Sequence, residues 1–256
     1  MIPDSLSALF DGLSAAQLLL CALAVLFASF MRAFTGFGFA LLAVPVFSLF
    51  LVPGDSVVLA AVLTLVVSAM TYKAWWGKFS VGELLPMAFG SVLGSAVGVR
   101  FLAGASLVEF QLWIGITVVV ACLALARLQP RDERGGRWLA GGTGVFSGLM
   151  NGAFAIPGPP VVAYVMMCIA DAERSRAFLM AFFFFSNAIA LIMFHSAGVV
   201  TSLPFQLLVV AMPVMLIGDR LGAWLFQRVG GAAYRPVAFG ISLSVGVAIT
   251  AKALFG

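Results

Sequence analysis

The sequence predicts an all-α polytopic membrane protein. Of its 256 residues, 63% are hydrophobic and 9% are charged, and the mean hydropathy is +1.15, whereas about 25% of the residues in a soluble domain are charged. The apolar stretches are continuous, unlike the alternating segments of about 10 residues that form a membrane β-barrel. Helix-length apolar segments fill nearly the whole chain, which leaves no room for a soluble domain.

Ten apolar segments follow one another in two groups of five. A charged linker, residues 128–137, separates a first membrane repeat, 1–127, from a second, 138–256, within one transmembrane domain. The segments of the first repeat are Ala15–Ala33, Phe39–Val52, Val57–Trp76, Leu84–Leu102 and Leu107–Leu125. Those of the second repeat are Trp138–Met150, Pro157–Ala170, Ala177–Ser196, Leu203–Phe226 and Val237–Leu254.

A short motif indicates that the two halves arose by internal duplication. Gly90–Gly94 reads GSVLG and Gly218–Gly222 reads GDRLG. Each motif follows a proline and precedes an arginine, in the same order along its half. The fourth segment of one half therefore corresponds to the fourth segment of the other.

The cations of the loops predict the topology. If each half crosses the membrane five times, only Arg100 and Lys252 lie on one side, which is the asymmetry that the positive-inside rule expects. The opposite, cytoplasmic side then collects Lys73, Lys78, Arg127, Arg131, Arg134, Arg137, Arg174, Arg176, Arg228 and Arg235. If the first two segments of each half form one interrupted helix, eight crossings result and the cations divide almost evenly.

We therefore predict five segments in each half. An odd number inverts the second half relative to the first, which gives the inverted repeats common among secondary transporters. Both termini are then non-cytoplasmic. The predicted location is the plasma membrane, which is the inner membrane of a bacterium.

Two irregular stretches interrupt the apolar runs at corresponding places, TGFGF at Thr35–Phe39 and NGAFAIPGPP at Asn151–Pro160. The segment after each has about 14 residues, about 21 Å as a helix, which is short for a full crossing. We expect broken or re-entrant helices here. Irregular backbone at membrane depth is tolerated only inside protein or beside a watery cavity.

The residue types at these interruptions favour a binding site for an anion. A helix N-terminus carries unpaired N–H groups and a partial positive charge, and glycine lets a ligand approach the backbone closely. Tight turns and close helix packing are the alternative explanation, but matched interruptions in both halves point to a transport site. The candidate residues are Thr35, Gly36, Phe37, Gly38, Asn151, Gly152, Pro157, Gly158, Pro159 and Pro160.

Four further polar residues lie in the apolar segments, where each needs a reason. Arg32 either holds an anion by paired hydrogen bonds or extends to the cytoplasmic face. Asn187 either binds a solute or joins two helices. His195, the one histidine, and Asp219 are candidates for proton coupling, with a structural role as the alternative for each and a counter-ion role for Asp219.

The stretches FTGFGFALLAVP and GLMNGAFAIPGPPVVAYVM resemble the two signature segments of the TauE/SafE sulfite exporter family, also called the toluene sulfonate uptake permease family. The resemblance spans essentially the whole chain. It implies a membrane transporter of sulfite, organosulfonates or other small anions such as carboxylates. Family segments are usually richer in glycine, with runs such as GxGGG, where this chain has Gly36–Phe39 and Ala155–Pro160.

The sequence as a whole favours a secondary transporter for a small anion, embedded in lipid. A passive channel or the membrane subunit of a larger complex is the alternative, and a homo-oligomer is compatible with either. A membrane enzyme is disfavoured, because one histidine and the absence of HExxH leave no evident catalytic or metal site. We expect no cofactor. Cys21, Cys122 and Cys168 lie in separate segments, which offers no spacing for a metal site. We expect no nucleic-acid partner, because a net charge of +4 in a membrane chain reflects cationic cytoplasmic loops.

Overall fold

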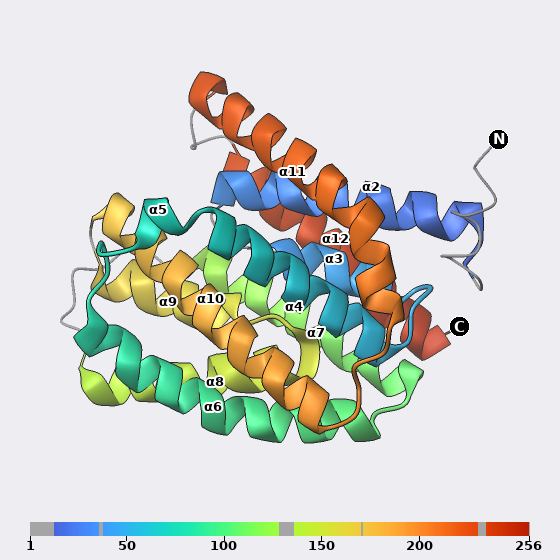
Figure 1. The fold of residues 1–256 in the computed structure, drawn as a ribbon, viewed down its shortest axis with the longest axis horizontal. Helices are drawn as coiled ribbons and strands as arrows, with labels where there is room; N and C mark the ends of the chain where they lie inside the picture. The colour runs from blue at the N-terminus through green and yellow to red at the C-terminus, as the bar shows by residue number, and fades with distance from the viewer. Residues whose placement is uncertain (1–12, 36–37, 128–135, 170, 230–233, 256) are drawn as a thin grey trace.

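The computed structural model describes residues 13–255 except 36–37, 128–135, 170 and 230–233. Its described residues form helices joined by short loops, without strands (Figure 1). The helices are α2 Ala15–Thr35, α3 Phe39–Phe47, α4 Pro53–Met70, α5 Tyr72–Trp75, α6 Val81–Gly104, α7 Leu107–Arg127, α8 Arg137–Phe154, α9 Gly158–Cys168, α10 Ala172–Ser196, α11 Leu203–Val229 and α12 Tyr234–Phe255. The all-α prediction is confirmed for this part of the chain.

Six of the described helices are long and apolar enough to cross a membrane. They are α2, α4, α6, α7, α10 and α11. Their exposed surfaces carry many large apolar side chains, such as Phe89 and Ile192, which suit lipid better than water. The chain is therefore a multi-pass membrane protein.

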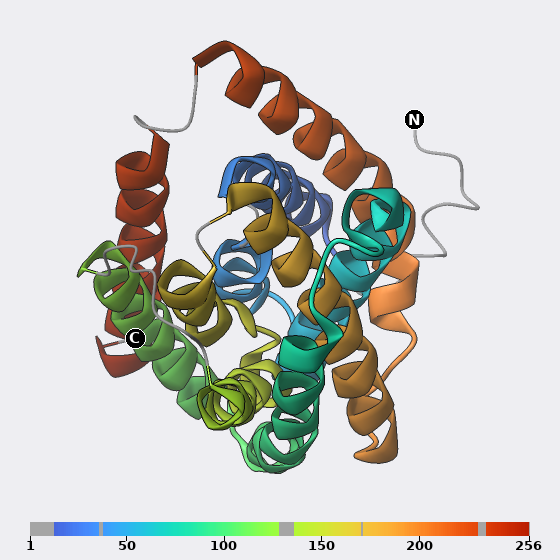
Figure 2. The same ribbon diagram turned by 90° about the vertical axis from the view of Figure 1, so that its left-hand side faces the viewer.

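The second segment of each half is shorter than the sequence predicts. Helix α3 has 9 residues and ends at Phe47, because the chain turns there and the Ser48 hydroxyl donates to the Pro45 carbonyl at 2.7 Å. Helix α9 has 11 residues. Nearly all of α3 is buried, and Figure 2 shows α3 inside the bundle while α11 and α12 lie at its rim. Two short helices thus occupy the protein interior.

The predicted interruption of the second half is also too long. Residues Asn151–Phe154 continue α8, so the break is limited to Ala155–Pro157. The reason is packing: Gly152 lies directly against Ser95 and Val99 of α6, and this contact extends the helix by a turn beyond the last apolar run. Asn151 and Gly152 are therefore helical residues.

The main helix pairs join the two halves reciprocally. The first helix of each half packs against the fourth of the other, α2 with α11 and α8 with α6. The third helices, α4 and α10, pack together, and so do the fifth, α7 and α12. Neither half could form its principal contacts alone.

Glycines bring α6 and α8 into backbone contact. Gly90, Gly94 and Gly98 lie against the backbone of α8, and Gly144 and Gly148 lie against the backbone of α6. At four-residue spacing these positions share one helix face, and small residues are what membrane helices use for close approach. A side chain at any of these positions would overlap the neighbouring main chain.

The same contact recurs between α11 and α2. Gly218 faces Leu26 and Ser29, and Gly222 faces Phe30 and Ala33. The motifs GSVLG and GDRLG thus perform the same packing task in the two halves. Their likeness in sequence reflects a likeness in contact.

Polar contacts join the loops at the two ends of the α4–α10 pair. Lys78, in the loop before α6, forms an ion pair with Glu173 at the start of α10, 2.7 Å between Nζ and Oε1. Thr201, in the loop before α11, donates its hydroxyl to Asp55 at the start of α4 at 2.6 Å. Each loop is tied to the third helix of the other half.

We predict that Gly94→Ala destabilises the protein whereas Gly142→Ala does not. A methyl group at position 94 would overlap the backbone of Val145, but at position 142 it would meet no atom within 4 Å. Over-packing costs about 1–3 kcal/mol or more, so Gly94→Ala should lower the midpoint of thermal unfolding in detergent by roughly 5 °C. Equal midpoints for the two variants would contradict the close backbone contact between α6 and α8.

Candidate functional site

The first break ends at Gly38, whose backbone conformation favours glycine. Gly38 precedes α3 with a φ of 99°, in the left-handed region, which glycine adopts without a steric penalty. Residues Gly36 and Phe37, and the side chain of Thr35, lie outside the described part of the structure. Gly38 therefore directs the start of α3 toward the interior.

The second break satisfies its backbone internally. Ala155 ends α8 in the left-handed region, with a φ of 55°, and its N–H donates to the Asn151 carbonyl at 2.8 Å, as in an αL C-cap. The N–H of Ile156 donates to the Met150 carbonyl at 3.3 Å. The Ser147 hydroxyl donates to the carbonyl of Pro157 at 2.6 Å. These bonds replace the water that a buried break lacks.

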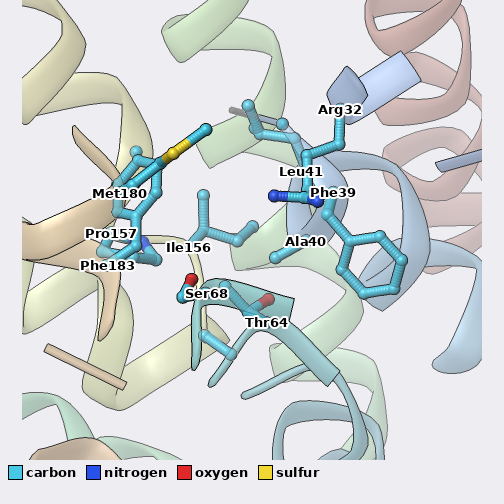
Figure 3. A pocket seen from close by; sticks show the side chains of 13 residues that line it. Arg32, Phe39, Ala40, Leu41, Thr64, Ser68, Ile156, Pro157, Met180 and Phe183 are labelled. Carbon is cyan, nitrogen blue, oxygen red and sulfur yellow. The ribbon is translucent and has the colours of Figure 1, made fainter. Parts of the chain in front are cut away.

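The two breaks meet at one cavity. Figure 3 shows Arg32 and the start of α3 on one side, Pro157 with Met180 and Phe183 on the other, and Thr64 and Ser68 between them. The cavity is lined by Arg32 of α2, Gly38–Leu41, Thr64 and Ser68 of α4, Ala155–Gly158, and Met180 and Phe183 of α10. Segments that are about 120 residues apart in the sequence thus share one site.

Helix N-termini give this cavity a positive field. The lining residues Gly38–Leu41 are the N-cap and the first residues of α3, and Ala155–Gly158 lead into α9, which begins at Gly158. The N–H groups of a first turn have no partner within the helix. In α9 only Gly158 offers such a donor in this turn, because Pro159 and Pro160 have no N–H. Most of the backbone donors therefore come from α3.

Arg32 is the cation of the cavity. Its side chain is 10% exposed, and one terminal nitrogen donates to Oδ1 of Asp219 on α11 at 2.7 Å. Its Nε is buried and has no hydrogen-bond partner among the residues that the structure describes. Arg176 of α10 also acts electrostatically on Arg32. The guanidinium is thus only partly satisfied by the protein.

Two hydroxyls of α4 line the cavity, and sequence reasoning missed both. Thr64 donates to the Ala60 carbonyl at 2.8 Å, so toward the cavity its oxygen can only accept. The Ser68 hydroxyl makes none of the hydrogen bonds found among the described residues, while its carbonyl accepts from Trp75 Nε1 at 2.8 Å. Their four-residue spacing on one helix face was the available signal.

Asn151 and Asn187 are completely buried but do not line the cavity. The amide nitrogen of Asn151 donates to the carbonyl and the hydroxyl of Ser186, at 2.9 and 2.8 Å, and Ser186 bonds the hydroxyl of Ser91 at 3.0 Å. Asn187 donates to the Phe183 carbonyl at 2.8 Å. Asn151 thus joins α8 to α10, and Ser186 extends this contact to α6, whereas Asn187 bonds a carbonyl of its own helix.

The remaining candidates lie apart from the cavity lining. Pro159 and Pro160 form the first turn of α9, and Gly152 packs on α6. His195 is exposed near the end of α10, and Asp219 reaches the site only through Arg32. The described residues hold no group of three His, Cys, Asp or Glu that could bind a metal.

Comparison with known proteins gives this arrangement a family. The family model described as "Sulfite exporter TauE/SafE" matches residues 21–249. The chain is 28% identical over 234 residues to a protein of Cupriavidus necator named "Probable sulfite/organosulfonate exporter TauE", and the match covers 88% of this chain and 91% of that protein. No solved structure matches. The chain therefore belongs to the TauE/SafE sulfite exporter family, whose members are membrane transporters and not enzymes.

Proposed function

We propose that the protein is a secondary transporter of a small anion, bound in the cavity between the starts of α3 and α9. The observation that carries this proposal is the meeting of both chain breaks with Arg32 around one cavity. The buried Nε of Arg32 has no hydrogen-bond partner among the described residues, and the first turn of α3 carries N–H groups that have no partner within the helix. An anionic group supplies acceptors for these donors.

The chemistry of the cavity and the name of the relative favour sulfite, an organosulfonate or a short carboxylate. Their oxygens match the Arg32 guanidinium, the Ser68 hydroxyl and the N–H groups of α3. Phe39, Met180 and Phe183 supply apolar wall, which suits the carbon part of an organic anion. The relative is named for sulfite and organosulfonate.

The proposed transport cycle rests on two inverted halves that rock against each other. The reciprocal pairing of α2 with α11 and of α8 with α6 supports this. With five crossings per half, the Lys78–Glu173 and Asp55–Thr201 contacts each join loops on one side of the membrane, whereas eight crossings would separate both pairs. In this topology residues 128–137 lie in the cytoplasm of a bacterial cell and both termini lie outside.

The test of function is transport into proteoliposomes of purified protein. The panel contains sulfite, methanesulfonate, a short carboxylate and, as controls, Na⁺ and K⁺. We expect saturable uptake of at least one anion and no uptake of the cations, because the cavity concentrates positive charge. Unsaturable flux would identify a passive channel, and no anion flux at all would overturn the proposal.

We predict that Arg32→Gln weakens anion affinity while the protein still inserts. Removing a hydrogen bond to a charged group costs about 1.5–3 kcal/mol, so the KM for the transported anion should rise about tenfold or more. Arg100→Gln is the matched control, because Arg100 is exposed and lies outside the cavity. An unchanged KM in Arg32→Gln would remove Arg32 from the binding site.

The topology is tested by labelling single cysteines in intact cells with a reagent that does not cross the membrane. After replacement of the three native cysteines, we expect labelling at Ser5→Cys and protection at Gly135→Cys. Permeabilised cells should expose position 135 and serve as the control. Labelling of position 135 alone in intact cells would invert the proposed orientation.

A further inference from the structure

The ion pair between Arg32 and Asp219 is the clearest unexplained feature of the site. It joins the first half to the second half, with 2.7 Å between the terminal nitrogen and Oδ1. A charged side chain within the membrane costs at least about 2.5 kcal/mol, so an isolated Arg32 or Asp219 would be unfavourable. Pairing explains why both charges are tolerated there.

A bound anion changes this balance. Arg32 lines the cavity, and its Nε has no hydrogen-bond partner among the described residues, so a solute would share the guanidinium with Asp219. Two anions would then face one cation whose side chain is 10% exposed, and like charges at short range disfavour each other's ionised form. Either the solute or the Asp219 carboxylate must then leave the guanidinium or become neutral by taking a proton.

The surroundings leave Asp219 as the group that can change. Helix α2 contributes Arg32 alone, and the acid of α4, Asp55, is engaged by Thr201. The cations near the pair are Arg176, which acts on Arg32, and Arg220, which follows Asp219 on α11 and is exposed. Arg228 stacks on Trp224 at 4.2 Å, and Lys252 of α12 is exposed. Arginine stays protonated at any physiological pH.

The other half of the molecule provides an internal comparison. Ser91 holds in GSVLG the position that Asp219 holds in GDRLG, and it forms a neutral cluster with Ser186 and Asn151. A carboxylate therefore stands at one of two equivalent positions. Packing alone does not require it, because serine fills the same place against α8.

We propose that Asp219 is the proton-binding site of the transporter and that the anion crosses together with one proton. The solute takes the Arg32 guanidinium, Asp219 Oδ1 gives up its hydrogen bond, and the carboxylate takes one proton from the water on the loading side. On the opposite side the anion leaves, Asp219 releases the proton to water, and the ion pair with Arg32 re-forms. One monovalent anion and one proton move together, so no net charge crosses.

This inference rests on the proposed function, and its test separates the two. Wild-type protein is reconstituted in vesicles with sulfite and methanesulfonate as the probes; methanesulfonate carries no proton to lose near neutral pH. An inward proton gradient of one pH unit should drive up to about tenfold accumulation. A potassium diffusion potential at equal pH should drive none, and accumulation that follows the potential alone would overturn the inference.

The decisive variant is Asp219→Asn, which keeps the shape of the side chain and its hydrogen-bond acceptor but binds no proton. We expect it to exchange labelled for unlabelled anion at the wild-type rate within a few-fold, and to lose accumulation under the proton gradient. Glu173→Gln, which removes a carboxylate from the exposed pair with Lys78, is the control and should accumulate normally. Asp219→Glu should restore part of the coupling.

Each outcome distinguishes the two proposals. Gradient-driven accumulation by Asp219→Asn equal to the wild type would overturn the proton site and leave the transporter intact. Failure of the wild type to transport any anion of the panel, the short carboxylate included, would overturn the proposed function and this inference with it. If Asp219→Asn does not insert, the response of the wild type to the proton gradient and to the potential still decides.

Discussion

The need to satisfy backbone polar groups away from water governs this structure. A helix that ends inside a membrane protein leaves N–H and C=O groups that lipid cannot pair. At the end of α8 these groups are paired by the turn at Ala155 and by Ser147. At the start of α3 the first-turn N–H groups have no partner within the helix, and the residues of this turn line the cavity.

The glycine contacts hold the helices that carry the two breaks close together. The α6–α8 and α2–α11 pairs carry the two breaks at the ends of α8 and α2, and Gly98 and Gly222 bring the backbones together near those ends. Each half positions the break of the other, because α6 belongs to the first half and α8 to the second.

Much of the fold followed from the sequence because hydrophobic length is a local property. The bounds of most long helices lie within a few residues of the apolar runs. The second break was misplaced, because Asn151 looks like a helix terminator in sequence yet bonds Ser186 on another helix. Whether a polar residue ends a helix or joins two helices depends on a neighbour that the sequence places elsewhere.

The residues that line the cavity were harder to predict for the same reason. The sequence left the role of Arg32 open, and its partner Asp219 is 187 positions away. Thr64 and Ser68 escaped notice because isolated hydroxyls on apolar helices commonly bond their own backbone, as Thr64 does. Gly38, Pro157 and Gly158 were identified because glycine and proline signal a break through their own backbone geometry.

The two contacts that tie the loops to the α4–α10 pair differ in a way that affects the solution conditions each end senses. The Lys78–Glu173 pair is solvent-exposed, with side chains 46% and 73% accessible, so dissolved salt screens it. The Asp55 carboxylate is buried and held by a hydroxyl, which salt screens far less. Ionic strength therefore weakens the contact at one end of the α4–α10 pair selectively.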